Sequence, residues 1–188
     1  FAILDTFYRK IYLCRDRYGE KPLYYGINNG VLFFGSQPKS FRKHPKWHPE
    51  ISSEALNEYL VRGYIGNEFS IYKGIYKLKP ANYISIDLTN INLLNGKSYW
   101  KHLNKEYDYS DSTEFINQLD KKINDIVKMR TISDRKIGSF LSGGIDSSLI
   151  TYYLQKQFIN PIDTFTVGFE DNNYDESKSA KKISNFLG

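Results

Sequence analysis

The chain has 188 residues, of which 40% are hydrophobic and 16% aromatic, a composition that excludes disorder and fits one domain or two small ones. The net charge of +5 arises from 26 basic and 21 acidic residues, and because both signs are mixed along the chain we expect no nucleic-acid partner. No apolar run is long enough to cross a membrane, so we expect no membrane partner, and the single cysteine, Cys14, suits a reducing, cytoplasmic compartment.

The first third of the chain predicts antiparallel β-structure. Short runs rich in Ile, Leu and Tyr occupy 1–5 and 10–16, and two aromatic runs lie within 21–36. The tripeptide Asn28-Asn29-Gly30 separates these two runs. It favours a tight hairpin turn, because Asn and Gly adopt left-handed conformations at little cost. Successive strands of this kind predict a layered β-structure and not a βαβ unit.

A helix is predicted over 52–64, where Ser52 or Ser53 can cap the first turn and Gly63 can end the last one. Its apolar side chains form one stripe: Ala55, Leu56, Tyr59 and Leu60. The alternating pattern of 70–87 returns to β-structure, whereas 88–112 is polar and has no strong period. We therefore expect a domain boundary at about residue 105.

The second half of the chain alternates helix and strand. A helix is predicted over 111–130, where Asp111 and Glu114 have the spacing of a capping box. The apolar side chains of this helix share one face: Phe115, Leu119, Ile123, Ile126 and Val127. The later elements are a strand at 136–141, a helix at 146–158, a strand at 162–169, and a helix at 174–188 with acidic residues in its first turn. This order predicts a parallel sheet covered by helices.

The segment "SGGIDSS" at 142–148 joins a predicted strand to a helix, at the edge of a parallel sheet where ligands bind. Gly143 and Gly144 would let the backbone approach a ligand, and the free N–H groups of the helix start would attract an anion. The hydroxyls of Ser142, Ser147 and Ser148 add donors. Asp146 would repel bare phosphate but could hold Mg²⁺ that bridges to it.

The alternative is an ordinary glycine turn in which Asp146 or Ser147 caps the helix. Two other phosphate motifs are excluded by spacing. A Walker A loop needs a Gly-Lys-Ser/Thr ending, and no Lys lies between 137 and 155. The dinucleotide fingerprint G-x-G-x-x-G is also missing.

The segment "LSGGIDSS" at 141–148 resembles the pyrophosphate loop of the N-type ATP pyrophosphatases. The flanking segments resemble glutamine-hydrolysing asparagine synthetases, in the same order: "RDRYGEKPLYY" at 15–25, "GIYKLKPANYISI" at 74–86, "YW" at 99–100, "SDRKIGSF" at 133–140 and "FTVGFEDNNYDES" at 165–177. The resemblance implies two domains. Residues 1–105 would be the C-terminal part of an α+β glutaminase domain, an antiparallel αββα fold, with a linker. Residues 106–188 would begin an α/β parallel-sheet domain of the adenine-nucleotide α-hydrolase-like, ATP pyrophosphatase type.

The function implied by this resemblance is that of a two-site amidotransferase. One domain would hydrolyse glutamine to ammonia, and the other would use MgATP to form a β-aspartyl-adenylate that ammonia converts to asparagine. A homodimer of the full-length protein is left open. Two alternatives are also open: a relative that amidates another carboxylate, such as a sugar acid of surface polysaccharides, or a non-catalytic binding module with a vestigial loop.

The resemblance carries site roles over to a few positions. The loop residues that would bind pyrophosphate are Ser142, Gly143, Gly144, Asp146, Ser147 and Ser148, and Asp146 would be the Mg²⁺ ligand. Phe140 and Val167 would contact adenosine or simply pack in the core. Asp175 and Glu176 would touch substrate or favour a helix start.

Some features depart from the family pattern. Lys136 stands where the family usually has proline. Cys14 does not match the N-terminal nucleophile of the glutaminase, so no catalytic residue is expected in this chain. Because the chain begins without Met inside a strand-like run and stops after a helical pattern, we expect an inactive internal fragment of a longer enzyme.

Overall fold

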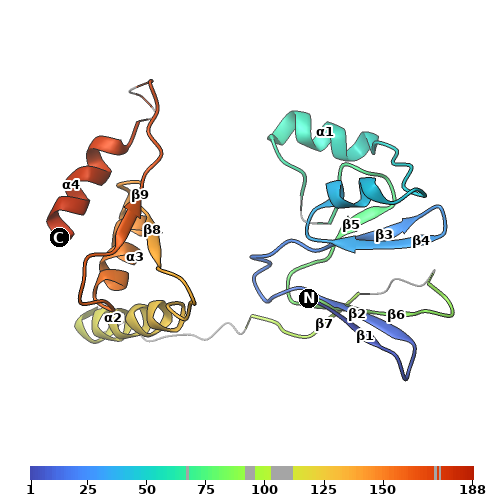
Figure 1. The fold of residues 1–188 in the computed structure, drawn as a ribbon, viewed down its shortest axis with the longest axis horizontal. Coiled ribbons are helices and arrows are strands. Elements are labelled where there is room, and N and C mark those ends of the chain that lie inside the picture. The colour runs from blue at the N-terminus through green and yellow to red at the C-terminus, as the bar shows by residue number, and fades with distance from the viewer. Residues whose placement is uncertain (67, 92–95, 103–111, 172, 174) are drawn as a thin grey trace. The chain divides into compact units, whose positions relative to one another are not determined.

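A computed structural model describes residues 1–66, 68–91, 96–102, 112–171, 173 and 175–188. The chain divides into two units, Phe1–Asn104 and Lys105–Gly188, and Figure 1 shows the elements of each. The chain is mixed α/β, with antiparallel sheets in the first unit. None of the described helices has both the length and the apolar character needed to span a membrane.

Two antiparallel sheets form the first unit. One sheet has the order β1–β2–β6–β7 and the other β4–β3–β5. Their strands are β1 (Ala2–Asp5), β2 (Lys10–Cys14), β3 (Tyr24–Asn28), β4 (Val31–Gly35), β5 (Ile75–Lys77), β6 (Asn82–Asp87) and β7 (Gly96–Ser98). The predicted hairpin is confirmed, because Asn28 pairs with Val31 and both turn residues are left-handed, with φ of 47° at Asn29 and 72° at Gly30. Strand β7 was not predicted.

The core of this unit lies between the two sheets, which face each other in Figure 1. Its buried members are Leu13, Leu23, Leu78, Ile84 and Ile86, with Tyr25 and Leu32 of the second sheet packed against them. On the other face of the second sheet, a 3₁₀-helix, η1 (Pro38–Lys43), brings Phe41 against Phe33, Trp47 and Ile75. Alternation along each strand therefore gives the second sheet two buried faces.

Helix α1 (Ser53–Arg62) lies on the side of the second sheet away from the first sheet (Figure 1). Both predicted ends are confirmed: the Ser52 side chain accepts the Ala55 N–H at 3.3 Å, and Gly63 ends the helix with a φ of 76°. In the predicted stripe only Ala55 is buried. The other three side chains, Leu56, Tyr59 and Leu60, are 41–71% exposed.

The loop after β2 is held by charged side chains that bond to backbone. Arg15, only 6% exposed, donates hydrogen bonds to the carbonyls of Leu78 (2.6 Å), Gly19 (2.7 Å) and Lys21 (3.1 Å). The two oxygens of Asp16 accept the N–H groups of Lys21 (3.0 Å) and Glu20 (2.9 Å). The N–H of Lys21 and then that of Glu20 hold the pKa of Asp16 below its ordinary value.

The second unit pairs β8 (Gly138–Phe140) with β9 (Asp163–Phe165) in parallel, so the predicted parallel pairing is confirmed. Its helices are α2 (Ser112–Met129), α3 (Ile145–Gln155) and α4 (Ser177–Leu187). Asp111, the predicted cap of α2, lies outside the described residues. The prediction of acidic residues in the first turn of α4 is wrong, because that helix begins at Ser177, after Asp175 and Glu176.

Helices α2 and α3 share the core of this unit, formed by Val127, Tyr153 and Leu154 with Ile123, Ile137 and Ile162 packed against them. The Tyr153 hydroxyl donates to the Asp120 carboxylate at 2.5 Å, which together with burial raises the pKa of Tyr153 to about 12. Of the predicted α2 face, Val127 is buried and Ile123 half-buried. Phe115, Leu119 and Ile126 remain 39–45% exposed.

Replacing Asp16 with Asn should destabilise the first unit at neutral pH, because an amide cannot accept an N–H at both of its ends. The lowered pKa means that the charged carboxylate stabilises the fold fully above the ordinary value of about 3.9. This stabilisation is lost as the pH falls through the lower folded-state pKa. The urea midpoints of wild type and variant should therefore differ at pH 7 and converge below about pH 4.

Tryptophan fluorescence can follow this unfolding, because both tryptophans, Trp47 and Trp100, lie in the first unit. Asp5→Asn is the matched control: Asp5 accepts a single N–H, that of Tyr8 at 2.9 Å, which an amide oxygen can also accept. Equal midpoints for Asp16→Asn and wild type at pH 7 would contradict the structural role of this carboxylate.

Candidate functional site

The predicted phosphate loop begins where β8 separates from β9. Leu141, 1% exposed, still donates its N–H to the Phe165 carbonyl at 2.9 Å, and its own carbonyl accepts the Thr166 hydroxyl at 2.7 Å. From Ser142 the chain turns away and enters α3 at Ile145. The loop therefore lies at the carboxyl edge of the parallel pair, where the sequence placed it.

The two glycines of the loop differ in what surrounds them. Gly143 has a φ of 85°, and a Cβ there would lie 2.8 Å from Ser179 Cβ and 2.9 Å from the Ala180 nitrogen. Gly144 has a φ of −75°, and its Cβ would meet only Ser142 Oγ, at 3.4 Å. Packing against α4 therefore explains Gly143, whereas no steric contact among the described residues requires glycine at 144.

The three loop hydroxyls bond within the loop. Ser142 and Ser147 hydroxyl oxygens lie 2.9 Å apart, and Ser147 Oγ also accepts the Ser142 N–H at 3.2 Å. Ser142 Oγ accepts the Gly144 N–H at 3.3 Å, and the Ser148 hydroxyl donates to the Gly144 carbonyl at 2.6 Å. These bonds shape the loop, and the hydroxyls would have to redirect their protons to bind a phosphate oxygen.

The start of α3 has no side-chain cap. The N-cap residue is Gly144, and in the described part of the chain no acceptor bonds to the N–H groups of Ile145, Asp146 or Ser147. The alternative in which Asp146 or Ser147 caps this helix is therefore wrong. Uncapped N–H groups and the positive end of a helix dipole are the features that favour anion binding at a helix start.

Asp146 is exposed, and among the described residues no hydrogen bond or ion pair engages its carboxylate. The described residues contain no group of three or more His, Cys, Asp or Glu side chains that could hold a metal. A cation at Asp146 would consequently need ligands from a bound molecule. Mg²⁺ is commonly held in this way, by one or two carboxylates together with phosphate oxygens.

Phe140 and Val167 lie at the same edge and are 81% and 65% exposed, so neither packs in the core of the described unit. The Phe140 ring is 6.3 Å from that of Phe165. Asp175 is engaged locally, since its carboxylate accepts the Ser177 hydroxyl (2.8 Å) and N–H (3.1 Å). These two bonds, the hydroxyl first, lower the pKa of Asp175, and they support its role at the helix start.

A buried polar contact that the sequence did not suggest anchors α3 to β8. The hydroxyls of Ser139 and Thr151, both under 9% exposed, lie 2.8 Å apart. Thr151 also donates to the Ser147 carbonyl at 2.7 Å. The signal in the sequence was weak, a polar residue inside an apolar strand and another inside an apolar helix. This contact fixes how far the loop can move from the strand that carries it.

Comparisons with known proteins agree with the motifs. Residues 1–100 match the family of glutamine amidotransferase domains, and residues 118–188 match the asparagine synthase family. The chain is 31% identical over its whole length to a putative glutamine-hydrolysing asparagine synthetase 2 of Methanocaldococcus jannaschii, and 32% identical over 95% of its length to asparagine synthetase 1 of Bacillus subtilis. It is also 28% identical over its whole length to amidase chyE of Penicillium rubens.

These matches confirm the resemblance inferred from the motifs. The chain spans 36%, 27% and 30% of the lengths of these three relatives, respectively. Both family matches cover segments that carry the motifs, and the phosphate loop lies within the second.

Replacing the two loop glycines with Ala, one at a time, should lower the free energy of unfolding to different extents. Gly143→Ala combines a left-handed φ with a clash against α4 and should cost roughly 1–3 kcal/mol of unfolding free energy. Gly144→Ala changes a helix N-cap without strain and should cost under about 1 kcal/mol. Urea unfolding followed by far-ultraviolet circular dichroism would measure both. Equal losses would show that packing does not distinguish the two glycines.

Proposed function

Because the chain belongs to the family of glutamine amidotransferase domains through residues 1–100, we propose that it is part of an ATP-dependent, glutamine-hydrolysing amidotransferase, an asparagine synthetase. The proposal extends to the domains: residues 1–105 form the C-terminal part of the glutaminase domain with its linker, and 106–188 begin an ATP pyrophosphatase domain. The observation that carries it is the uncapped N-terminus of α3, preceded by Gly144 and followed by the unpaired Asp146.

The loop would bind the pyrophosphate part of ATP. The free N–H groups of Ile145, Asp146 and Ser147 point out of the helix start, as the first N–H groups of any helix do. Gly144 leaves room for a phosphate oxygen to approach the backbone, and Ser142, Ser147 and Ser148 can turn their hydroxyls toward it. Gly143 would contribute to binding indirectly, because its lack of a side chain lets the loop pack closely against α4.

The proposed reaction activates a carboxylate that ammonia cannot attack directly. The substrate carboxylate displaces pyrophosphate from ATP to give an acyl-adenylate, and ammonia from glutamine then displaces AMP to give the amide. Charge accumulates on the departing pyrophosphate, and fixed N–H dipoles at the loop stabilise it without reorganising. Mg²⁺, when bound between Asp146 and the phosphates, would supply further charge neutralisation.

Phe140 and Val167 would contact the adenosine part of ATP through their exposed apolar surface at the same edge. We assign no catalytic residue to this chain. Cys14 is half-buried in β2, where its thiol contacts the Arg15 carbonyl at 3.9 Å, a structural position. The substrates would be the small molecules ATP, aspartate and glutamine, in a reducing compartment such as the cytoplasm.

A second candidate keeps the ATP chemistry and changes the acceptor. The acceptor would be a carboxylate other than aspartate, such as a sugar acid, and one relative, amidase chyE, is likewise not named an asparagine synthetase. A non-catalytic module with a vestigial loop is disfavoured, because the start of α3 leaves backbone N–H groups without acceptors among the described residues. The acceptor does not alter the expected role of the loop.

Asp146→Asn should weaken the binding of MgATP, because the metal-bridged contact is lost. It should not weaken the binding of ATP in EDTA, because the carboxylate repels phosphate that carries no metal. We expect an affinity for MgATP about tenfold lower, the effect of one lost charge-assisted contact. Isothermal titration calorimetry on the 188-residue chain measures both. Asp134→Asn is the control, an exposed aspartate in the segment before β8. Equal MgATP affinities for wild type and Asp146→Asn would refute the role of this carboxylate.

Pyrophosphate release in the complete enzyme tests the reaction itself. Aspartate should stimulate pyrophosphate release from MgATP, and Asp146→Asn should lower the rate by about 10²-fold, as expected when a preorganised electrostatic contact is removed. Stimulation by a different carboxylate and not by aspartate would select the second candidate. Release without any carboxylate dependence would exclude both.

A further inference from the structure

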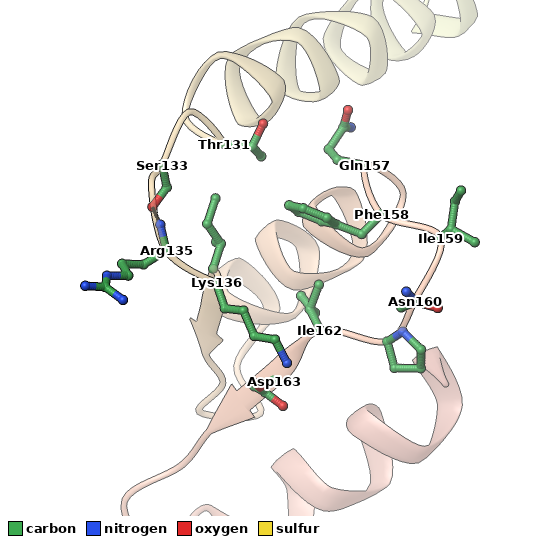
Figure 2. A pocket seen from close by; sticks show the side chains of 12 residues that line it. Thr131, Ser133, Arg135, Lys136, Gln157, Phe158, Ile159, Asn160, Ile162 and Asp163 are labelled. Atoms are coloured by element: carbon green, nitrogen blue, oxygen red, sulfur yellow. Dashed lines mark hydrogen bonds between the residues drawn. The ribbon is translucent and has the colours of Figure 1, made fainter.

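A second pocket lies at the end of β8 and β9 opposite the phosphate loop. It has a volume of about 560 Å³ and is formed by two chain segments, 131–137 before β8 and 157–163 before β9 (Figure 2). This volume is within the range of about 300–1,000 Å³ typical of small-molecule sites. The proposed function makes no use of it.

Hydrogen bonds fix the wall of this pocket that precedes β9. The Gln155 amide donates to the carbonyls of Phe158 (3.4 Å) and Asn160 (3.2 Å), and its oxygen accepts the Ile162 N–H at 3.0 Å. The Gln157 amide donates to Asn124 of α2 at 2.9 Å. A loop closed in this way is preorganised, which lowers the entropic cost of binding a ligand.

The lining of the pocket combines three charged residues, Arg135, Lys136 and Asp163, with an apolar wall. Lys136 extends toward Asp163 in Figure 2, yet within the described part of the chain neither side chain forms an ion pair. Phe158, 38% exposed, supplies an aromatic surface beside Ile162. Ser133 Oγ accepts the Arg135 N–H at 3.1 Å, so the Ser133 hydroxyl proton is free to donate.

A ligand with a single charge would match only half of this lining. A simple anion would be attracted by Lys136 and repelled by Asp163, and a simple cation would meet the reverse. A zwitterion can satisfy both charges, and an apolar group attached to it can bury the exposed part of Phe158. This combination is the structure of an α-amino acid with an apolar side chain.

We propose that this pocket binds an apolar α-amino acid at a site distinct from the phosphate loop. Lys136 binds the carboxylate, Asp163 binds the ammonium group, and the side chain of the ligand packs against Phe158. Arg135 takes no part, because Figure 2 shows its side chain directed away from the pocket.

The test uses L-phenylalanine as the probe, titrated into the 188-residue chain by calorimetry, with amide chemical shifts to locate the site. Saturable shifts should be confined to 131–137 and 157–163. N-acetyl-L-phenylalanine lacks the ammonium group and L-phenylalaninamide lacks the carboxylate, so each should bind about tenfold more weakly. Lys136→Gln and Asp163→Asn should each weaken L-phenylalanine binding to the same extent, and Arg135→Gln, which removes the adjacent charge, should not.

Two results would overturn the proposal: shifts that map outside these two segments, or an affinity unchanged by both Lys136→Gln and Asp163→Asn. Lys136→Arg keeps the charge and should retain binding, which separates a lost contact from a damaged fold. Because L-phenylalanine binding is measured without nucleotide, its outcome is independent of the ATP titration of Asp146→Asn.

Discussion

The parallel pairing of β8 with β9 is the constraint on which both candidate sites depend. Parallel strands that follow one another need a crossover, and here α3 provides it, so α3 must begin at the carboxyl edge of β8 and end near the start of β9. The uncapped helix end and the exposed side chains of Phe140 and Val167 consequently share one edge. The return loop after α3 meets the loop before β8 at the other edge and forms the second pocket (Figure 2).

In the proposed phosphate loop, some residues maintain the shape of the loop and others are the ones proposed to bind ATP. Gly143 and the hydroxyl pair of Ser139 and Thr151 hold the loop to α4 and to β8, through a close backbone approach and a buried hydrogen bond. Among the described residues, only Ser142 Oγ would lie near a Cβ at Gly144, and no hydrogen bond or ion pair engages the Asp146 carboxylate. Binding of a phosphate would redirect the serine hydroxyls but would leave the Gly143 packing and the Ser139–Thr151 bond intact, so the backbone of the loop is preorganised.

The sequence predicted those features that depend only on a few neighbouring residues, namely a hairpin turn and the two ends of a helix. The Asn29-Gly30 turn and the two ends of α1 follow from residues that adopt left-handed conformations or accept a helix N–H. Strand β7 escaped prediction because Gly96–Ser98 has no apolar pattern and is a strand only through its pairing with β6. The second pocket was not predicted either, because it brings together two segments, 131–137 and 157–163, whose side chains carry no motif.

The hydrogen bonds that each aspartate carboxylate accepts distinguish aspartates with a structural role from aspartates that are candidates for ligand binding. Asp16 accepts two backbone N–H groups, and Asp175 accepts a hydroxyl and an N–H, so protonating or replacing either should act on stability. Asp146 and Asp163 have no such partners among the described residues, although each lies within a cluster of groups able to bind a ligand. An exposed charge without an ion-pair partner contributes little to folding, and in the first turn of α3 Asp146 adds only a helix-dipole interaction of ~0.3–1 kcal/mol. Substitution at these two positions should therefore change binding before it changes stability, whereas the order is reversed at Asp16 and Asp175.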